Sequence, residues 1–490
     1  MEFLTPPWKH QLEAIERAKD APHFALFFDP GTGKTGTAIN ILRHQFKEAG
    51  RILRTLILCP PIVISNWKDE FAKHSKVDPH RIHLLTGSGP KRARYFMQQA
   101  FDHARKPIPQ IFVTNYEALL MDPLFHALQE WAPEILIVDE SQKIRNPTAR
   151  RTRRTDLLAN PSDKKTKITT PRPKVYLLSG SPILNHAIDI FSQFLVLDGG
   201  ETFGGNFFAF RSRYFRDKNA GMPTQRHFPD WVPHPGSLDA ISTLIAKKGM
   251  RVAKEDCLDL PPLVKQTIRV KANPKQAQVY EDMRKHLVAY LDGDTCVAQL
   301  AVTKMLRLLQ IASGFYRTDE DKDIQLEENP KLGTLSELLE TIAPDHKVIV
   351  WAVFKENYKM IRSVCQKLDL PFVELHGEID NVQKMENVKR FNEDPAIRVC
   401  IGHPASGGIG VNLVAASYAI WFSRTFSLED RIQSEARNFR SGSEIHQKIT
   451  QIDLVMEGSV EEACLKALDR KTDLGISMLK ELIQAPMVHE

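Results

Sequence analysis

The sequence predicts an α/β fold made of two doubly wound parallel sheets with a helical insertion between them. Short, continuous apolar runs alternate with helical patterns through the first two hundred residues, and the same rhythm returns after residue 329. Strands that are buried on both faces of a parallel sheet have this continuous apolar character. At 490 residues the chain is also too long for a single core. Two α/β domains are therefore expected.

The elements follow in order from these runs. The first sheet should use residues 24–28, 55–59, 111–113, 135–138 and 175–178. After residue 200 the composition changes to aromatic residues, arginines and prolines, and helical patterns then cover 276–291 and 297–311. The second sheet should use 348–352, 372–375, 398–401 and 419–422, with one or two helices at 459–482. We therefore expect a first lobe at 1–198, a mostly helical insertion at 199–328 and a second lobe at 329–490.

The composition is that of a globular protein with a mild excess of positive charge. Hydrophobic residues make up 42% and charged residues 26%, and no apolar run approaches the roughly 20 residues of a membrane span. The amino terminus lacks a secretion signal, so we expect a cytoplasmic protein, in the nucleoid or host cytoplasm if bacterial or viral and nuclear if eukaryotic. The six cysteines are far apart and show no zinc-binding spacing. A net charge of +6 favours polyanionic partners without proving one.

A glycine loop after the first predicted strand has the features of a phosphate-binding loop. Gly31 and Gly33 allow backbone N–H groups to turn toward an anion, and Lys34 can reach terminal phosphates. The hydroxyl of Thr35 suits Mg²⁺. The strict pattern has a further glycine where this chain has Phe28, so an ordinary turn before a helix is the alternative. The candidate nucleotide-binding residues of this loop are Pro30, Gly31, Thr32, Gly33, Lys34 and Thr35.

Further candidate residues lie near the predicted strand ends. Asp139 and Glu140 follow the apolar run at 135–138, at the sheet edge where open α/β sheets bind ligands. Asp139 would hold the metal ion, and Glu140 would orient or deprotonate the attacking water. Such a pair alone is also common as a solvated strand end. Gln11 precedes the loop and can offer an adenine edge a donor and an acceptor.

Taken in order, these segments resemble the motif series of the superfamily 2 helicase-like ATPases, and within them the Swi/Snf-type DNA translocases. The segments of the first region lie at 7–11, 29–35, 58–63 with 66–67, 113–117, 138–146 and 178–185. Those of the second region lie at 350–354, 375–377, 405–413 and 430–442. Stretches 143–146, 259–262 and 306–310 favour the Swi/Snf type over a plain unwinding helicase. The resemblance covers nearly the whole chain.

The resemblance implies two RecA-like lobes that clamp ATP, with Mg²⁺, between them. Arg437 and Arg440 would act as arginine fingers, Gln433 would belong to the same catalytic motif, and Gly410 would approach the nucleotide. Two guanidinium groups three residues apart share one helix face, where both can meet charge developing on a phosphate, although a solvated basic face is the alternative. The chain departs from the family pattern at Ser141-Gln142, Ser179, Ser181 and Phe439. We expect these departures to affect coupling between the lobes more than hydrolysis.

A basic tract between the acidic pair and residue 178 is the candidate DNA-binding segment. Such a tract binds a polyanion through counterion release and carries little base specificity. A solvated loop or a nuclear address would have the same composition. Further on, arginines interleave with aromatic residues at 210–216, which suits either nucleic-acid contacts or core packing. The residues of the basic tract proposed for DNA are Arg150, Arg151, Arg153, Arg154, Lys164, Lys165 and Lys167.

Together these observations favour a monomeric, DNA-dependent ATPase that couples hydrolysis to movement along duplex or branched DNA. Its substrate would be DNA, alone or within a nucleoprotein. Its cofactors would be ATP and Mg²⁺. No membrane partner is expected. Three alternatives remain open. They are a strand-separating helicase, a motor directed by RNA, and a nucleotide-gated scaffold that binds nucleic acid without hydrolysing ATP.

Overall fold

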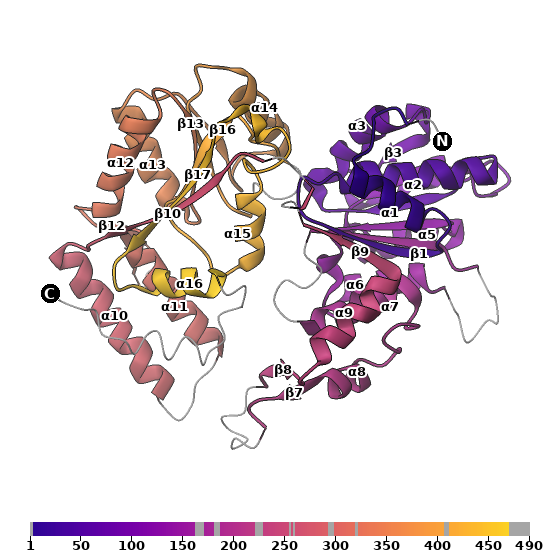
Figure 1. Ribbon diagram of the computed structural model, residues 1–490, viewed down its shortest axis with the longest axis horizontal. Coiled ribbons are helices and arrows are strands. Elements are labelled where there is room, and N and C mark those ends of the chain that lie inside the picture. The colour runs from indigo at the N-terminus through magenta and orange to yellow at the C-terminus, as the bar shows by residue number, and fades with distance from the viewer. Residues whose placement is uncertain are drawn as a thin grey trace. The chain divides into compact units, whose positions relative to one another are not determined.

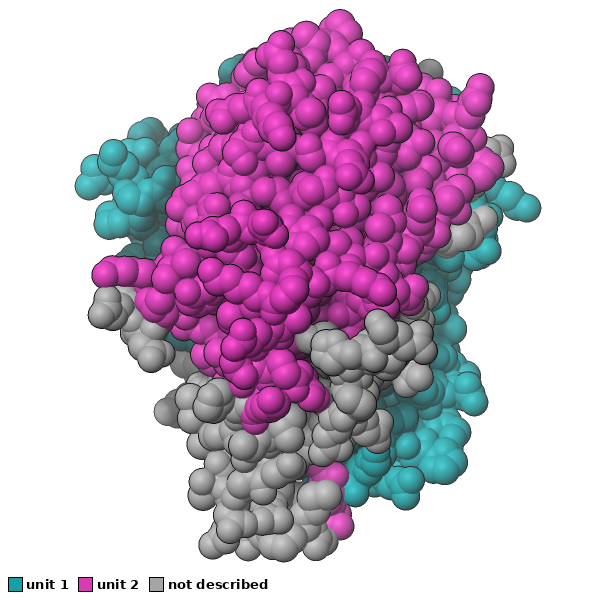
Figure 2. Space-filling view, turned by 90° about the vertical axis from the view of Figure 1, so that its left-hand side faces the viewer, with its two compact units in different colours: residues 1–218, 229–258 teal, residues 219–228, 259–490 magenta. Residues whose placement is uncertain are grey.

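The computed structural model divides the chain into two compact units, which are described separately (Figures 1 and 2). One unit contains residues 1–218 and 229–258, and the other contains 219–228 and 259–490. The structure describes residues 3–161, 171–180, 187–220, 229–253, 256–257, 260–292, 298–318, 322–405 and 411–469. In this part of the chain, no helix is long and apolar enough to cross a membrane.

The first unit is built on a seven-stranded parallel sheet with the strand order β3-β4-β2-β5-β6-β1-β9. The five predicted strands are confirmed with end shifts of one residue or so. The sequence did not predict β3, which has only three residues, or β9, which forms an edge of the sheet. The strands are β1 (His23–Phe28), β2 (Thr55–Leu58), β3 (Ile82–Leu84), β4 (Ile111–Thr114), β5 (Ile135–Asp139), β6 (Lys174–Ser179) and β9 (Gly249–Val252).

Helices cover both faces of this sheet (Figure 1). Outside the sheet, the chain also forms a small antiparallel pair between α8 and α9 in the sequence. It consists of β7 (Phe215–Asp217) and β8 (Trp231–Pro233). The helices are α1 (Lys9–Ala18), α2 (Lys34–Ala49), α3 (Ile64–His74), α4 (Gly89–Ala100), α5 (Asp122–Trp131), α6 (Arg150–Ala159), α7 (Ile190–Asp198), α8 (Phe207–Tyr214) and α9 (Ser237–Lys248).

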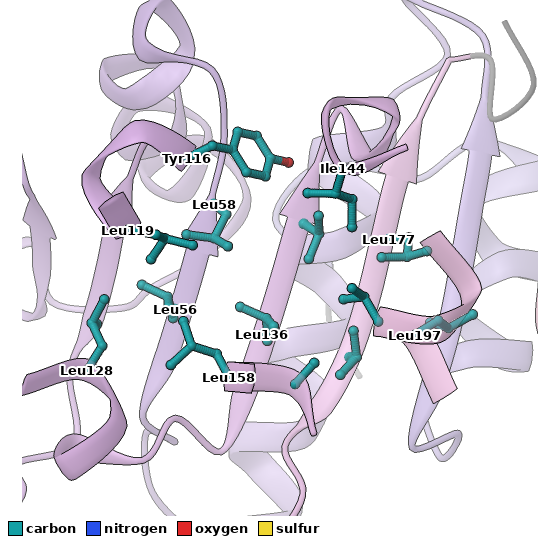
Figure 3. Packing of buried hydrophobic residues seen from close by; sticks show 14 of the residues in the cluster. Leu56, Leu58, Tyr116, Leu119, Leu128, Leu136, Ile144, Leu158, Leu177 and Leu197 are labelled. Carbon is teal, nitrogen blue, oxygen red and sulfur yellow. The ribbon is translucent and has the colours of Figure 1, made fainter. Parts of the chain in front are cut away.

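One layer of the core shows why the apolar runs become central strands. Leucines from three neighbouring strands, Leu56, Leu136 and Leu177, are fully buried and face Leu128 of α5 and Leu158 of α6 (Figure 3). Each such side chain contributes about 1.5–3 kcal/mol when it leaves water. Packing of this kind on both faces fixes the sheet, and the carboxyl ends of its strands then present the candidate site at one edge.

The second unit has a six-stranded parallel sheet with the order β10-β17-β16-β13-β15-β14. The four predicted strands are present, whereas β10 and β17 were not predicted. The strands are β10 (Leu263–Val270), β13 (Lys347–Trp351), β14 (Phe372–Leu375), β15 (Val399–Gly402), β16 (Ala416–Trp421) and β17 (Ile449–Met456), and a short antiparallel pair joins β11 (Phe315–Arg317) to β12 (Asp323–Gln325). The helices are α10 (Pro274–Asp292), α11 (Ala298–Ala312), α12 (Pro330–Ile342), α13 (Lys355–Lys367), α14 (Asn381–Glu393), α15 (Leu428–Glu435) and α16 (Val460–Asp469).

The predicted fold class, two doubly wound parallel α/β units, is therefore confirmed. The region expected as a helical insertion, 199–328, does contain α8 to α11. It also supplies β9 to the first sheet and β10 to the second, so it belongs partly to each unit. The proposed boundaries at residues 198 and 328 stay a prediction. The expected terminal helix begins as α16, and residues beyond 469 lie outside the described residues.

Candidate nucleotide site

Helix α1 supports the glycine loop through two side chains. The Gln11 amide donates from Nε2 to the carbonyl oxygen of Gly33 at 3.1 Å, and its Oε1 accepts from the backbone N–H of Trp8 at 2.7 Å. The ring Nε2 of His10 lies 2.9 Å from the carbonyl oxygen of Thr32. Gln11, predicted as an adenine contact, thus also braces the loop. His10 was not predicted, because a histidine at that position has no distinguishing sequence signal.

The loop itself has the geometry that its glycines allow. Gly31 and Gly33 adopt φ angles of 91° and 82°, in the left-handed region that favours glycine. A Cβ on Gly33 would lie 2.1 Å from the Gln11 amide nitrogen, so a side chain there would collide with α1. Lys34 begins α2, and its Nζ donates to the carbonyl oxygen of Phe28 at 3.2 Å. Its ammonium group therefore lies over the loop, where a phosphate would be held.

Asp139 ends β5 in a buried position. Its Oδ2 accepts from the indole Nε1 of Trp67 at 3.2 Å, and its Oδ1 accepts from the backbone N–H of Glu140 at 3.0 Å. Burial and the neighbouring charge of Glu140 raise the pKa of Asp139 to about 7, although Lys34 and the Trp67 hydrogen bond oppose this rise. Lys34 contacts the last residue of β1, and β1 and β5 lie on either side of β6 with their carboxyl ends at the same edge of the sheet. Trp67 was part of the motif series but had no predicted role.

Glu140 is held by a short relay of hydrogen bonds. Its backbone adopts a φ of 53°, which is uncommon outside glycine and turns the carboxylate away from the strand direction. The Gln142 amide donates to Glu140 Oε2 at 2.6 Å, and the hydroxyl of Ser179 donates to Gln142 Oε1 at 2.8 Å. Gln142 and Ser179, two departures from the family pattern, therefore contact each other and link the end of β6 to the proposed water-orienting acid.

In the second unit, α15 carries Gln433, and the turn after it carries the proposed arginine fingers. Arg437 and Arg440 therefore do not share a helix face as predicted, because α15 ends at Glu435. Gln433 donates to Glu429 at 3.2 Å. The side chain of Arg437 is 4% exposed, and its Nη1 donates to the carbonyl oxygen of Val411 at 3.2 Å. Arg440 is more exposed than Arg437. Gly410 lies outside the described residues. Since these side chains and Lys34 belong to different units, their convergence on one nucleotide stays a prediction.

A buried network of charged residues anchors α15. Arg431 of α15 forms two hydrogen bonds to Asp453 of β17, at 2.6 and 2.8 Å, and its guanidinium lies 3.8 Å from the centre of the Trp421 ring. Arg424 lies 3.4 Å from the same Asp453 carboxylate. These contacts lower the pKa of Asp453 against the effect of its burial. Ion pairs thus tie α15, which carries Gln433 and precedes the two arginines, to the sheet.

A second buried pair stands beside this network. Lys331 of α12 and Glu461 of α16 are each 1% exposed and lie 2.8 Å apart. Glu461 also accepts from the backbone N–H of Met456 at 2.8 Å. Burial lowers the pKa of Lys331 to about 8, although the Glu461 charge acts in the opposite direction. Sequence reasoning missed these ions because a single lysine or glutamate on an amphipathic helix carries no sign of burial.

The basic tract is partly structural. Arg150 and Arg154 of α6 both pair with Asp122, and Arg154 is 13% exposed with its guanidinium 4.7 Å from the Phe125 ring centre. Arg151 lies 3.7 Å from Glu117, whereas Arg153 is exposed. Lys164, Lys165 and Lys167 lie outside the described residues. The proposed DNA contacts stay a prediction, and Arg153 is the arginine of α6 that is best placed for a partner.

A parallel α/β unit whose first strand leads through a glycine loop into a helix, beside an acidic strand end, is characteristic of P-loop nucleotide-binding proteins. Comparison with known families makes the class specific. Residues 16–314 match the SNF2-related domain, and residues 330–442 match the helicase conserved C-terminal domain. The chain belongs to the SNF2-related family of helicase-like ATPases in superfamily 2, and this membership implies ATP hydrolysis.

Curated proteins that match this chain are distant from it in sequence. Human TATA-binding protein-associated factor 172 is 24% identical over 522 residues, which cover 94% of this chain and 27% of the relative. The chain thus spans about a quarter of the length of the first curated relatives that it matches. Protein p41 of Acyrthosiphon pisum secondary endosymbiont phage 1 is 25% identical, with 88% of this chain and 87% of p41 covered.

Among solved structures, the SWI2/SNF2 ATPase core of Sulfolobus solfataricus in complex with dsDNA is similar to this chain. It is 21% identical with a TM-score of 0.43, and the match covers 98% of this chain and 93% of that chain.

Proposed function

We propose that this protein is an ATP- and Mg²⁺-dependent motor that moves along duplex or branched DNA and remodels DNA or nucleoprotein. The observation that carries the proposal is that Lys34, which contacts the end of β1, and the acids Asp139 and Glu140 at the end of β5 belong to one edge of the first sheet. A cationic phosphate ligand, an acidic metal ligand and a positioned base are the parts that phosphoryl transfer needs. Each part is held by hydrogen bonds from neighbouring elements.

The residues present fit a magnesium ion. Mg²⁺ prefers oxygen ligands from a few carboxylates or hydroxyls together with substrate phosphates. Thr35 at the start of α2 and Asp139 at the end of β5 supply such oxygens, and the left-handed Gly31 and Gly33 open the loop to an anion. When bound, the ion would neutralise charge on the phosphates. The protein's own part is that Lys34 holds the terminal phosphates and Glu140 takes or orients the proton of the attacking water.

Support for DNA as the partner comes from charge and from the relatives. The exposed arginines of α6 follow the acidic pair closely in the chain and suit a phosphate backbone. One similar solved structure is a complex with dsDNA, and a relative is named as a TATA-binding protein-associated factor. We propose that the protein works as a monomer in the cytoplasm, or in the nucleus if it is eukaryotic. The remaining rivals are strand separation, RNA-directed movement and binding without turnover.

Phosphate release in the presence of duplex DNA, single-stranded DNA and RNA tests the proposal. We expect duplex DNA to stimulate hydrolysis most. Lys34→Ala should abolish turnover and leave DNA affinity largely intact, because it removes the phosphate ligand only. Lys47→Ala, at the exposed far end of the same helix, is the matched control. ATP turnover by the Lys34→Ala variant would contradict the assignment of the phosphate-binding site. Absence of release with every polynucleotide would favour the scaffold.

Movement and strand separation are distinguished by two substrates. A triplex whose third strand is displaced without unwinding reports translocation along intact duplex DNA. A labelled fork reports strand separation. We expect triplex displacement that depends on ATP and on Lys34, and little opening of the fork.

A further inference from the structure

Helix α8 and the β7–β8 pair form a distinct end of the first unit, beyond α7 and α9 (Figure 1). The inner side of α8 belongs to the core. Phe210 and Tyr214 are buried, and the Phe210 ring centre lies 5.2 Å from those of Phe191, to which it is tilted, and Phe203, which it meets edge to face. Core packing is therefore the role of the aromatic residues that the sequence interleaves with arginines here. The outer side of the helix has a different composition.

The outer side presents an arginine, Arg211, that contacts neighbouring aromatic rings. Phe208 is 66% exposed, which makes it the most exposed aromatic side chain among the exposed hydrophobic residues of the described chain. The guanidinium of Arg211 lies 5.1 Å from the Phe208 ring centre and 3.9 Å from that of Trp231 on β8. This arrangement fixes the arginine through cation–π contacts.

Additional exposed cations follow Arg211 closely along the chain. Arg213 and Arg216 are exposed, as is Lys218 at the end of β7. Within the described residues neither Arg213 nor Arg216 has an ion-pair partner. The nearest acid along the strand, Asp217, accepts from the backbone N–H of Asp230 at 2.9 Å. The segment 208–216 therefore combines an exposed ring with exposed arginines, a combination suited to a partner with both flat aromatic faces and negative charge.

We propose that Phe208, Arg211, Arg213 and Arg216 bind an unpaired stretch of nucleic acid, with a base stacked on Phe208 and phosphates on the arginines. This inference rests on the proposed function as a nucleic-acid motor. The favoured partner is a single strand because only an unpaired base offers its face to a protein ring, whereas duplex bases are stacked on each other. Branched DNA contains such unpaired positions at its junctions. A duplex alone would use the arginines and leave Phe208 exposed.

The test compares one blunt duplex with the same duplex carrying a single-stranded tail. Wild-type protein should bind the tailed DNA more tightly. Phe208→Ala should weaken binding to the tail by roughly tenfold, the scale of one base–aromatic stack, and should not change binding to the blunt duplex. Phe208→Trp should retain the preference, while Phe208→Leu, which stays apolar without a ring, should lose it. Val382→Ala, which removes an 82% exposed side chain from the second unit, is the control.

The contribution of the arginines is measured separately, through the salt dependence of binding. Replacing Arg213 and Arg216 together by glutamine should lower the salt dependence of tail binding by a slope of about 1.4, since each phosphate contact on a single strand contributes about 0.7. Equal affinities of wild type and Phe208→Ala for the tailed DNA would overturn the inference. If duplex DNA still stimulated hydrolysis, the proposed function would survive that result. Absence of stimulation by any polynucleotide would instead remove the proposed function.

Discussion

The two units hold their candidate catalytic residues by different means. In the first unit the supports are uncharged: Gln11 holds the loop, Trp67 holds Asp139 and Gln142 holds Glu140. In the second unit the support of α15 is ionic, through Arg431 and Asp453. Neutral hydrogen bonds position a charge without cancelling it, so Lys34 and the two acids stay available for a ligand. Ion pairs cancel buried charge and resist separation, which suits a helix that must keep its orientation.

The largest expected effect concerns Arg440, which is the less buried of the two proposed arginine fingers. Arg440→Ala should lower DNA-stimulated turnover by a factor on the order of 10³, as for other arginine fingers. Arg440→Lys should recover little, because it keeps the charge but loses the planar fork. Steady-state phosphate release at saturating DNA measures both. A loss below about tenfold would restrict Arg440 to a structural role and leave the second unit without a demonstrated finger.

Breaking the ionic support should destabilise the second unit specifically. Asp453→Asn leaves Arg431 and Arg424 without their shared carboxylate, so we expect a loss of about 3–5 kcal/mol in the free energy of unfolding. Hydrogen exchange of the β17 amides measures this loss in the second unit alone. Glu130→Gln, which breaks the exposed pair with Arg105 in the first unit, should cost about 1 kcal/mol or less. Similar costs for the two variants would contradict the comparison.

Breaking a neutral support should change catalysis more than stability. Gln142→Leu removes the link between Ser179 and Glu140, and we expect kcat to fall by roughly 10- to 100-fold as the acid loses its position. The KM for ATP should change little, because the phosphate loop is untouched. Gln142→His, which restores a hydrogen-bonding ring common in the family, should recover part of the rate. A change confined to KM would show that Gln142 acts on binding.

The smallest effect tests a neutral support elsewhere in the first unit. His23 Nε2 accepts from Arg172 at 2.8 Å, and burial, together with the Arg172 charge, lowers the pKa of His23 to about 4. The unfolded chain takes up this proton below about pH 6.5 and the folded chain does not. Stability should therefore fall between pH 6.5 and 4, by about 1–2 kcal/mol given the half-exposed ring.

His23→Gln should flatten this pH dependence in thermal unfolding followed by first-unit signals. His126→Gln, at an exposed histidine of α5, is the matched control and should leave the dependence unchanged. A dependence that is unaltered by His23→Gln would assign it to other groups.

The sequence predicted the central strands well because burial on both faces leaves a continuous apolar run, as in residues 135–138. Three of the four edge strands, β3, β9 and β10, were missed because they lack such a run, whereas the edge strand β14 was predicted. In β10, Lys265 and Gln266 are exposed, since only one side of an edge strand is covered by a neighbour. The eight-residue strand β17 was also missed, because Thr450, Gln451 and Asp453 interrupt its apolar pattern. These polar residues are nevertheless buried, and Gln451 forms a hydrogen bond there while Asp453 forms ion pairs.

The candidate site was predictable where one residue type is demanded by chemistry. The loop glycines, Lys34 and the acidic pair follow from the needs of a phosphate and a metal ion. Supporting residues were not predictable in their roles, because Trp67, His10 and Gln142 act through contacts between segments far apart in the chain. The availability of Arg150 and Arg154 likewise depends on Asp122, which no local pattern connects to them.

The brace between Gln11 and Gly33 has a consequence for nucleotide choice. A primary amide has two N–H bonds and two oxygen lone pairs, and in this protein one of each is already used by Gly33 and Trp8. The remaining N–H and lone pair are left in a fixed orientation. They match the donor and acceptor on the edge of adenine, whereas guanine would bring its carbonyl oxygen against the amide oxygen. The Gln11 amide, which also shapes the phosphate loop, would then favour ATP over GTP because its orientation is fixed.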